Sequence, residues 1–346
     1  MDYRKYTDFA VEQTLELLRI DSPTSYTFEA AAAVKEAFEN LGYAALFTNK
    51  GGVIVDFGGD DDSNALLFEV HIDTLGGIVS GILPDGRLRI NPLGGLSANN
   101  TESENVRVIT KFDGSYEGTF QLHNPSTHVN KENAATVRTF DNMEVVLDEF
   151  TTTAEQTRDL GIEVGDIVCF DPRSVVTEKG YIKSRFLDDK LSCGILLGLA
   201  KLMRDEHLTP SRRVYAHVTV YEEVGHGGSA SVPDGVTEAI SIDMGCVGDG
   251  ISCTERQVSI CAKDSHGPYS YEVIKKLISA ARSEGADYAV DVYPKYGSDV
   301  ERTLYAGYDV RHGLLGAGVF ASHGYERSHK DGVENALKTL KGYLGL

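Results

Sequence analysis

Apolar residues recur at helical spacing in five segments of the chain and run together in five shorter ones. The helical spacing predicts helices over residues 6–18, 27–41, 191–204, 269–284 and 330–344. The apolar runs predict strands over residues 44–56, 65–70, 213–221, 239–243 and 313–320. Short, continuous apolar runs are typical of buried strands in a sheet covered by helices. The pattern therefore predicts an α/β protein.

The middle of the chain has a different pattern of apolar and turn-forming residues. From about Gly76 to Gly180, short alternating runs are separated by glycine, asparagine, aspartate and proline. Such runs are typical of a small β-rich domain. The simplest organisation is an α/β domain of residues 1–75 and 181–346, interrupted by an inserted β-rich domain of residues 76–180.

Composition excludes some classes of partner. The 346 residues include 33 Lys or Arg and 52 Asp or Glu, which gives a formal net charge of −19. This length fits about two domains, and a hydrophobic content of 41% fits a folded protein with a core. Because so acidic a chain repels phosphate backbones and anionic membrane surfaces, we expect neither nucleic acid nor membrane as a partner. Cations and cationic groups are better candidates.

Location can also be predicted. No segment reaches the roughly 18 apolar residues of a membrane span, and the residues after Met1 lack the apolar region of a signal peptide. The five cysteines form an odd set without a Cys-x-x-Cys pair, which favours reduced, mostly buried thiols over disulfides or a thiolate zinc site. We therefore expect a cytoplasmic protein.

Candidate chemical groups follow the predicted strands, where an open α/β sheet places its ligand-binding loops. His71 and Asp73 follow the apolar run of residues 65–70. Residues two apart in an extended segment face the same side, so the Asp73 carboxylate could hold the second ring nitrogen of His71, as is usual for a metal-binding histidine. Taken alone, such a pair could also be a surface or core contact.

Two acidic pairs lie at the predicted ends of other elements. Asp188 and Asp189 precede an apolar helix, where acids often cap the helix N-terminus but where a carboxylate could also bridge two cations. Glu222 and Glu223 close an apolar strand. Because neighbours in a strand point to opposite faces, one glutamate could bind metal while the other reaches a water molecule. In isolation, the glutamates could simply be solvated.

Asp243 and a histidine complete the candidate set. Asp243 ends a predicted strand, where a turn is the alternative role, and His323 and His329 follow the last strand, where a capping or surface role is the alternative. The set then comprises His71, Asp188, Glu223, Asp243 and His323. Two imidazoles and three carboxylates suit two divalent ions such as zinc or cobalt better than magnesium or calcium. Glu222 remains free as a general base.

The order His-x-Asp, Asp-Asp, Glu-Glu, Asp, His resembles that of the two-metal aminopeptidases, and most closely the tetrahedral, deblocking or glutamyl aminopeptidases of metallopeptidase family forty-two. The resemblance covers nearly the whole chain. Its most specific segments are Val220-Tyr221-Glu222-Glu223-Val224-Gly225, Phe186-Leu187-Asp188-Asp189-Lys190 and Ile242-Asp243. It implies a mixed-sheet, phosphorylase/hydrolase-like catalytic domain, with that family's oligomerisation domain at the inserted β-rich domain.

The resemblance also implies roles for residues. It assigns His71, Asp188 and Asp243 to one metal and Asp188, Glu223 and His323 to the other, with Glu222 as catalytic base and acid and Asp73 orienting His71. It favours Asp188 over Asp189, because the second position varies more in the family. It favours His323 over His329, because the spacing from Gly297-Ser298-Asp299 matches that family.

The implied activity is metal-dependent hydrolysis of the N-terminal peptide bond of peptides, by a homo-oligomer that is a dodecamer by resemblance. A two-metal deacylase acting on small amides would use the same centre. A glycosidase would use Glu222 and Glu223, but retaining enzymes need carboxyl groups about 5 to 5.5 Å apart, which neighbours on opposite strand faces fit badly. A metal-stabilised, peptide-binding scaffold is the remaining alternative, and it would have no use for a free Glu222.

Overall fold

The structure, a computed structural model, describes all 346 residues. It divides into a larger unit of residues 1–73 and 173–346 and a smaller unit of residues 74–172. The expected second boundary at residue 180 differs from this division by several residues. The reason is that β10 (Val175–Val176) pairs with β11 (Tyr181–Ser184), which belongs to the sheet of the larger unit.

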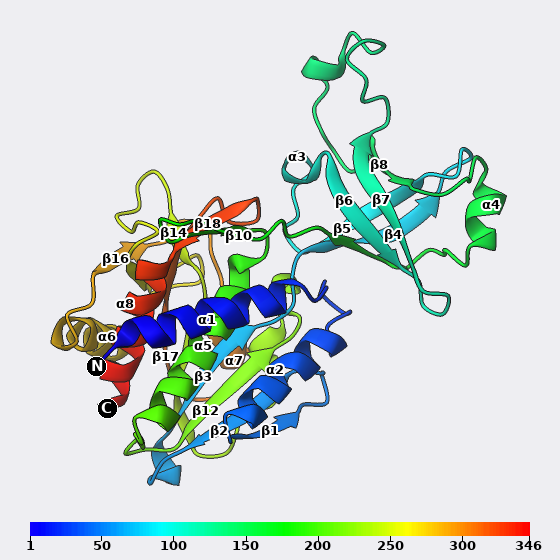
Figure 1. Cartoon of the computed structure of the whole chain (residues 1–346). Coiled ribbons are helices and arrows are strands. Elements are labelled where there is room, and N and C mark those ends of the chain that lie inside the picture. Colours follow the sequence, from blue (N-terminus) through cyan, green and yellow to red (C-terminus); the bar gives the residue numbers. More distant parts are fainter. The chain divides into compact units, whose positions relative to one another are not determined.

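A twelve-stranded sheet forms the centre of the larger unit (Figure 1). Besides β10 and β11, its strands are β1 (Ala44–Phe47), β2 (Val53–Gly58), β3 (Ala65–His71), β12 (Val214–Thr219), β13 (Val236–Ile242), β14 (Gly245–Val247), β15 (Val258–Lys263), β16 (Tyr288–Val292), β17 (Arg311–Phe320) and β18 (Glu326–His329). The main path runs β1-β2-β12-β3-β13-β17-β18-β11-β10, while β14 and β15 pair with β17 and β16 pairs with β15.

The central strands β12, β3, β13 and β17 run parallel to one another. All seven residues of β3 are buried, as expected for a continuous apolar run in a sheet covered on both faces. Because parallel strands end at a common edge, the residues that follow them come together there. His71, Glu222 and Asp243 all lie at or just beyond this edge.

Six helices belong to the larger unit, namely α1 (Tyr3–Leu18), α2 (Phe28–Asn40), α5 (Leu187–Asp205), α6 (Tyr271–Ser283), α7 (Asp299–Tyr305) and α8 (Lys330–Leu344). Three short 3₁₀ turns, η1 (Asp62–Asn64), η3 (Glu222–Val224) and η4 (Gly227–Ser229), join its strands and helices. Helix α1 packs along α5 and α8, and both of these contact β17. None of the helices combines the length and the apolar composition that a membrane crossing needs.

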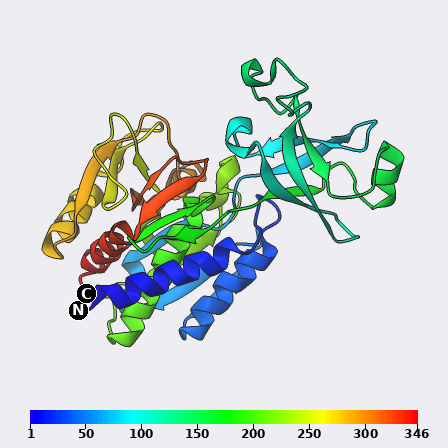
Figure 2. The same ribbon diagram turned by 45° about the horizontal axis from the view of Figure 1, so that its top comes forward.

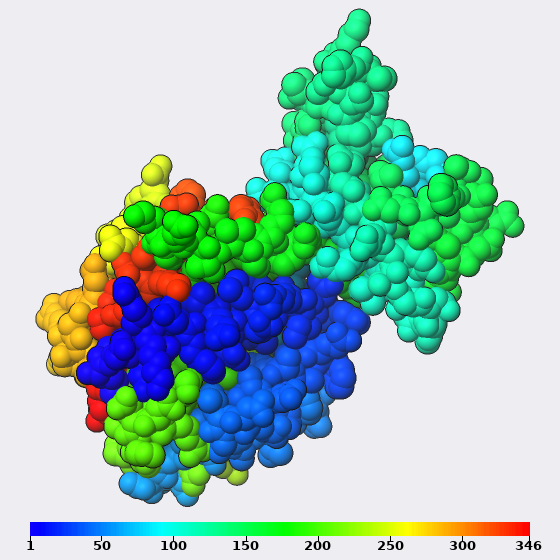
Figure 3. Space-filling model, viewed as in Figure 1, coloured from blue at the N-terminus to red at the C-terminus, as the bar shows by residue number.

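The N-terminal helices cover one face of the larger unit. Both ribbon views show α1 and α2, coloured blue, side by side in front of the sheet, and the two chain ends close together (Figure 2). The space-filling view shows the same helices as a continuous surface (Figure 3). The sheet beneath them is therefore shielded from solvent on this side.

Helix α5 approaches α1 closely at Gly194. A Cβ atom at this position would lie 2.1 Å from Thr14 Oγ1 and 2.5 Å from the carbonyl oxygen of Ala10. Glycine is thus required for the observed spacing of the two helices. Since Asp188 lies in the first turn of α5, this packing also helps to place Asp188 at the edge of the sheet.

Parts of the larger unit differ from the expected elements. The apolar run of residues 44–56 forms a hairpin of β1 and β2 instead of one strand, because the chain turns between Thr48 and Gly52, with Gly51 at a φ of 97°. Strands β15, β16 and β18 and helix α7 also lie outside the predicted elements. They are short, and their burial depends on neighbours distant in the sequence.

The smaller unit is built on a closed barrel of six antiparallel strands in the order β4-β5-β8-β7-β6-β9. Its elements are β4 (Gly76–Ile82), β5 (Leu88–Leu93), α3 (Ala98–Thr101), β6 (Glu104–Ile109), β7 (Ser115–Leu122), η2 (Asn133–Ala135), β8 (Met143–Leu147), α4 (Ala154–Asp159) and β9 (Ile167–Phe170). Inward positions alternate with exposed ones along β5 and β6. Inside the barrel, the rings of Phe120 and Phe170 meet edge to face at 5.6 Å.

Candidate metal centre

The five candidate ligands lie in two adjoining groups at the edge of the large sheet. The groups are His71, Asp188 and Asp243, and Asp188, Glu223 and His323. Within each group the potential ligand atoms lie within 4.8 Å of one another. Because Asp188 belongs to both groups, its two carboxylate oxygens can serve two cations at once.

The first group is built on the ends of two parallel strands. His71 is the last residue of β3, and its Nε2 lies 3.0 Å from Asp188 Oδ1. Asp243 follows β13 directly, and its backbone N–H donates to the Leu315 carbonyl oxygen at 3.0 Å. Both side chains are almost completely buried. The sheet itself therefore fixes this half of the centre.

Asp73 contacts His71 differently from the expectation. The His71 Nδ1 atom lies 2.9 Å from the backbone oxygen of Asp73, whereas the nearest Asp73 carboxylate oxygen is 3.7 Å away. The Asp73 carboxylate instead accepts hydrogen bonds from the backbone N–H groups of Glu222 at 3.1 Å and Glu223 at 3.3 Å, and from Thr24 Oγ1 at 2.8 Å. Asp73 thus ties the loop of the glutamates to the end of β3.

The second group is built from turns. His323 Nε2 lies 3.5 Å from Asp188 Oδ2 and 3.7 Å from Glu223 Oε2. The other carboxylate oxygen of Glu223, Oε1, is buried and has no hydrogen-bond partner. A buried carboxylate oxygen without a partner is costly, so the Glu223 carboxylate, which is grouped with Asp188 and His323, fits a cation ligand.

Two residues with left-handed backbone conformation lie in the turns that place Glu223 and His323. Tyr221, with a φ of 70°, precedes Glu222 and Glu223, which lie in the 3₁₀ turn η3 and not in a strand. Successive side chains in a 3₁₀ helix are rotated by about 120°, so the expected placement on opposite strand faces is wrong. His323, with a φ of 61°, likewise lies in the turn between β17 and β18.

Asp188 and Asp189 have distinct environments. Asp188 points between the two histidines, with which it forms ion pairs. Asp189 Oδ2 accepts the backbone N–H of His71 at 3.2 Å, and Asp189 belongs to neither ligand group. The geometry therefore favours Asp188 as the shared ligand and gives Asp189 the task of holding the backbone of His71.

His329 is engaged elsewhere. Its Nε2 lies 2.8 Å from the Lys179 carbonyl oxygen, and its Nδ1 accepts the backbone N–H of Asp331 at 3.0 Å, so His329 caps helix α8. Both ring nitrogens are occupied by these hydrogen bonds. Of the two candidate histidines, His323 is therefore the one placed to bind a metal.

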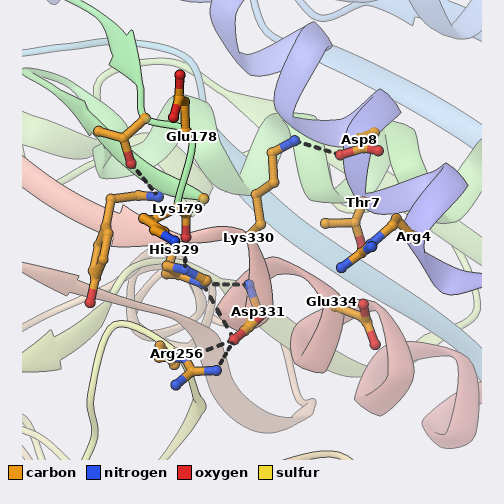
Figure 4. A pocket seen from close by; sticks show the side chains of 13 residues that line it. Arg4, Thr7, Asp8, Glu178, Lys179, Arg256, His329, Lys330, Asp331 and Glu334 are labelled. Carbon is orange, nitrogen blue, oxygen red and sulfur yellow. Dashed lines mark hydrogen bonds and ion pairs between the residues drawn. The ribbon is translucent and has the colours of Figure 1, made fainter.

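A polar cavity of about 620 Å³ lies between α1 and α8, and His329 is among its lining residues (Figure 4). None of the candidate metal ligands lines it. Much of its charge is neutralised within the chain, because Lys330 pairs with Asp8 at 2.6 Å and Arg256 pairs with Asp331 at 2.6 Å. The candidate metal ligands thus lie at the edge of the sheet and not in this cavity.

Glu222 stands beside the ligands without belonging to either group. Its Oε2 lies 3.9 Å from His71 Nε2, and its side chain is 16% exposed, enough to meet a small molecule at the centre. Burial raises the pKa of Glu222 well above its usual range, and the nearby carboxylate of Asp299 raises it further. A carboxylate with a raised pKa holds a transferred proton more readily, which suits a general base and acid.

The electrostatics of the centre favour cations. Burial and the Asp188 carboxylate raise the pKa of Asp243 to about 7. Burial alone would lower the pKa of His323, but its hydrogen bond to Asp188 and the charges of Asp188 and Glu223 outweigh this effect and raise the pKa to about 10. So many carboxylates packed around two imidazoles fit a pair of divalent ions of the kind bound by mixed nitrogen and oxygen ligands.

A third group with ligand-like spacing, formed by Asp264, His266 and Glu301, has a structural explanation. Tyr269 donates its hydroxyl to Asp264 Oδ2 at 2.7 Å and lies 3.1 Å from Glu301 Oε1. Glu301 also accepts the backbone N–H of Ser298 at 2.9 Å, as the partner in a capping box at the start of α7. These carboxylates anchor the loop that precedes α7.

Two buried acids at the centre are missing from the residues predicted to be functional. Glu326 accepts the backbone N–H of His323 at 2.9 Å. Asp299 accepts the Gly228 N–H at 2.6 Å and the hydroxyl proton of Thr219, and so holds the loop after Glu223. Both lie close to motifs identified in the sequence, but only the three-dimensional structure shows that they are buried against backbone donors.

Known proteins with similar sequences identify the family. The sequence pattern described as M42 glutamyl aminopeptidase matches residues 51–339. The chain belongs to this M42 family. One relative, the YhfE protein of Bacillus subtilis (strain 168), is 38% identical over 339 residues, which make up 97% of this chain and 98% of that protein.

Other similar proteins are more distant. The glutamyl aminopeptidase of Lactococcus lactis is 23% identical over 215 residues, which make up 62% of this chain and 59% of that protein. The solved TET1 peptidase of Pyrococcus horikoshii has the same fold, with a TM-score of 0.84 at 22% identity and coverage of 96% of this chain and 98% of that one. The family resemblance, the α/β fold class and the enzyme class are confirmed: this M42 protein is a metal-dependent aminopeptidase.

Proposed function

We propose that the M42 protein removes N-terminal residues from peptides at a centre of two divalent metal ions. The observation that carries this proposal is that Asp188 belongs to two ligand groups at once. His71 and Asp243 complete one group, and Glu223 and His323 complete the other. Each ion then has three protein ligands and room for a water molecule or substrate, the pattern of a catalytic metal site.

The residues of the centre divide the reaction between them. Bound divalent ions supply an activated water molecule and polarise the scissile carbonyl group. Glu222 takes the proton from the attacking water and delivers it to the nitrogen of the departing peptide. Asp73 keeps Glu222 and Glu223 in place through their backbone N–H groups. The acids around the centre also attract the positively charged α-amino group of a peptide substrate.

Zinc or cobalt are the ions that we propose, because two imidazoles and three carboxylates form a borderline ligand set. The test is metal analysis of the purified protein, followed by assays on a panel of aminoacyl-p-nitroanilides and matched N-acyl substrates. We expect cleavage of the aminoacyl compounds, loss of activity with a chelator, and recovery with zinc or cobalt. Preference for N-acyl substrates would favour a deacylase, and cleavage of glycosides with indifference to chelators would favour a glycosidase.

Assembly and location complete the proposal. The solved TET1 peptidase is described as assembling into a tetrahedron or a large octahedral shell. We propose that this M42 protein also forms a homo-oligomer, specifically a dodecamer, with the barrel unit as a contact. A light-scattering mass near that of one 37.6 kDa chain would contradict this assembly. The proposed location is the cytoplasm, which suits five free cysteines.

A further inference from the structure

Glu326 makes an unusual pair of contacts at the second ligand group. Its side chain is 2% exposed and lies at the start of β18. One carboxylate oxygen, Oε2, accepts the backbone N–H of Asp188 at 3.1 Å, and the other, Oε1, accepts the backbone N–H of His323 at 2.9 Å. A single carboxylate therefore links two candidate ligands that are more than a hundred residues apart in the sequence.

These two ligands need such a link because no regular element fixes their backbones. Asp188 has a non-helical conformation, with φ −74° and ψ 102°, at the start of α5, and it follows the left-handed Phe186. His323 is itself left-handed. In contrast, the backbone N–H of Asp243 bonds to the neighbouring strand at Leu315. The second group is thus the half of the centre whose geometry the sheet leaves open.

The position of Glu326 in the sheet suits this linking role. Strand β18 pairs with β11, where Glu326 lies opposite Ser184, and with β17, where Arg327 lies opposite Phe320. The chain runs from Ser184 into the Asp188 turn and from Phe320 into the His323 turn. Glu326 is therefore anchored beside the starting points of both turns and can set the distance between them.

We propose that Glu326 is a positioning residue for the second metal ion. By accepting both backbone N–H groups, it holds Asp188 and His323 at the separation that lets them bind one cation together with Glu223. It acts through these ligands and does not touch the ion or the substrate. This inference rests on the two-metal centre of the proposed function. It adds that one residue outside the ligand set can change the affinity for one metal ion more than the affinity for the other.

The test is the variant Glu326→Gln, which keeps the shape of the side chain. A glutamine can accept only one of the two N–H groups, because its NH₂ group would face the other donor. Metal-free wild type and variant are titrated with Co²⁺ by calorimetry and visible absorption. Loss of an outer partner of a ligand typically costs 10- to 100-fold in metal affinity. Because His323 belongs to one group and Asp188 to both, we expect that loss for one equivalent of cobalt and a clearly smaller loss for the other.

Glu255→Gln is the matched control. Glu255 pairs at 3.0 Å with Arg327, the residue next to Glu326 on β18, and its side chain forms no hydrogen bond or ion pair with Asp188 or His323. It should bind both equivalents of cobalt like the wild type. If Glu326→Gln binds both equivalents normally, or weakens both equally, the inference is overturned.

Two further measurements keep the test decisive. If Glu326→Gln does not fold, as judged by thermal unfolding, Glu326→Asp carries the same expectation, because a side chain shorter by one methylene cannot reach both N–H groups. In kinetics at saturating cobalt, kcat should return toward the wild-type value, which a purely structural defect would not permit. Cobalt binding is measured without a peptide, so a wild type that binds two ions but cleaves no aminoacyl substrate refutes only the proposed function.

Discussion

The two ends of strand β13 show opposite solutions to burying a carboxylate. Near the amino end, Glu238 is fully buried, and it is surrounded by Arg212, by Arg311 at 3.2 Å and by the Tyr343 hydroxyl at 2.6 Å. Beyond the carboxyl end, Asp243 is equally enclosed, but it lies in one group with another carboxylate, Asp188, and with His71. The first cluster contains its own cations, whereas the second gathers acids.

The pKa values of the two residues reflect this difference. Burial by itself would raise the pKa of Glu238, but the hydrogen bond from Tyr343 and the bond and charge of Arg212 outweigh it and lower the pKa to about 2. Burial and Asp188 raise the pKa of Asp243 to about 7. Equal burial thus leaves the ionised carboxylate favoured where the chain supplies cations, as at Glu238. It leaves the ionised form disfavoured where other carboxylates lie nearby and the chain supplies fewer cations, as at Asp243.

The largest effect is expected for the residue shared by both ligand groups. In Asp188→Asn, the charge that attracts both ions is lost, so we expect metal content to fall from two equivalents to below one. Because metal ions contribute several kcal/mol to catalysis, kcat/KM should fall by about 10³-fold or more. Elemental analysis and steady-state assays measure both. Asp189→Asn is the matched control, with an expected loss of about 10- to 100-fold, and an equal loss in both variants would contradict the assignment of Asp188.

Glu222→Gln removes an acid from the same cluster without removing a ligand. General acid–base catalysis contributes about 10² to 10⁴-fold, so we expect kcat to fall by that factor. Metal content should stay at two equivalents, since Glu222 belongs to neither ligand group. Substantial turnover in this variant would reject the role of Glu222, and loss of an ion would make Glu222 a ligand.

Chelation should lower stability through the metal centre beyond the carboxyl end of β13 and not through the Glu238 cluster at its amino end. An ion held at a hundred times its Kd stabilises the folded state by about 2.7 kcal/mol. Removing it should lower Tm by roughly 4 °C in a chain of this size, as measured by calorimetry with and without a chelator. Glu238→Gln should show the same chelator-dependent shift as the wild type. A chelator effect that disappears in that variant would show that the two clusters are not independent.

Glu238→Gln itself should leave activity unchanged and act on stability only. It leaves Arg212 and Arg311 without their buried partner, so the free energy of unfolding should fall by about 1–3 kcal/mol at pH 7, measured by urea denaturation. Because the pKa of Glu238 is lowered, its contribution is present above the ordinary glutamate pKa of 4.5 and is lost as the pH falls toward 2. The difference between variant and wild type should therefore vanish in acid.

A surface residue of the same cluster provides the control for Glu238. Lys276 lies 3.4 Å from Glu238, and its side chain is 54% exposed. Exposed ion pairs contribute about 0 to 1 kcal/mol, so Lys276→Gln should change stability by less than Glu238→Gln does. An equal loss in the two variants would mean that the buried arginines do not provide the main stabilisation of Glu238.

Sequence patterns predicted the central strands of the large sheet and its main helices, because the patterns of these elements are local. The largely apolar run before His71 and the helical spacing before Leu344 are properties of short segments, so neighbouring residues in the sequence are enough to reveal them. The hairpin at Gly51 was missed because its turn lies inside an apolar run that is typical of one strand. Strands such as β15 fell outside the predictions for another reason, because β15 pairs with β17, which lies far along the chain.

The same division applies to the metal centre. The sequence alone determined which side chains are candidates for the chemistry, because acids and histidines that follow parallel apolar strands meet at one edge of the sheet. Only the tertiary structure decided how they are used: that Asp73 holds backbone N–H groups, that Glu222 and Glu223 share a 3₁₀ turn, and that Glu326 links two ligands. These contacts are made by backbone groups in irregular turns, whose conformations are set by packing and leave no periodic pattern in the sequence.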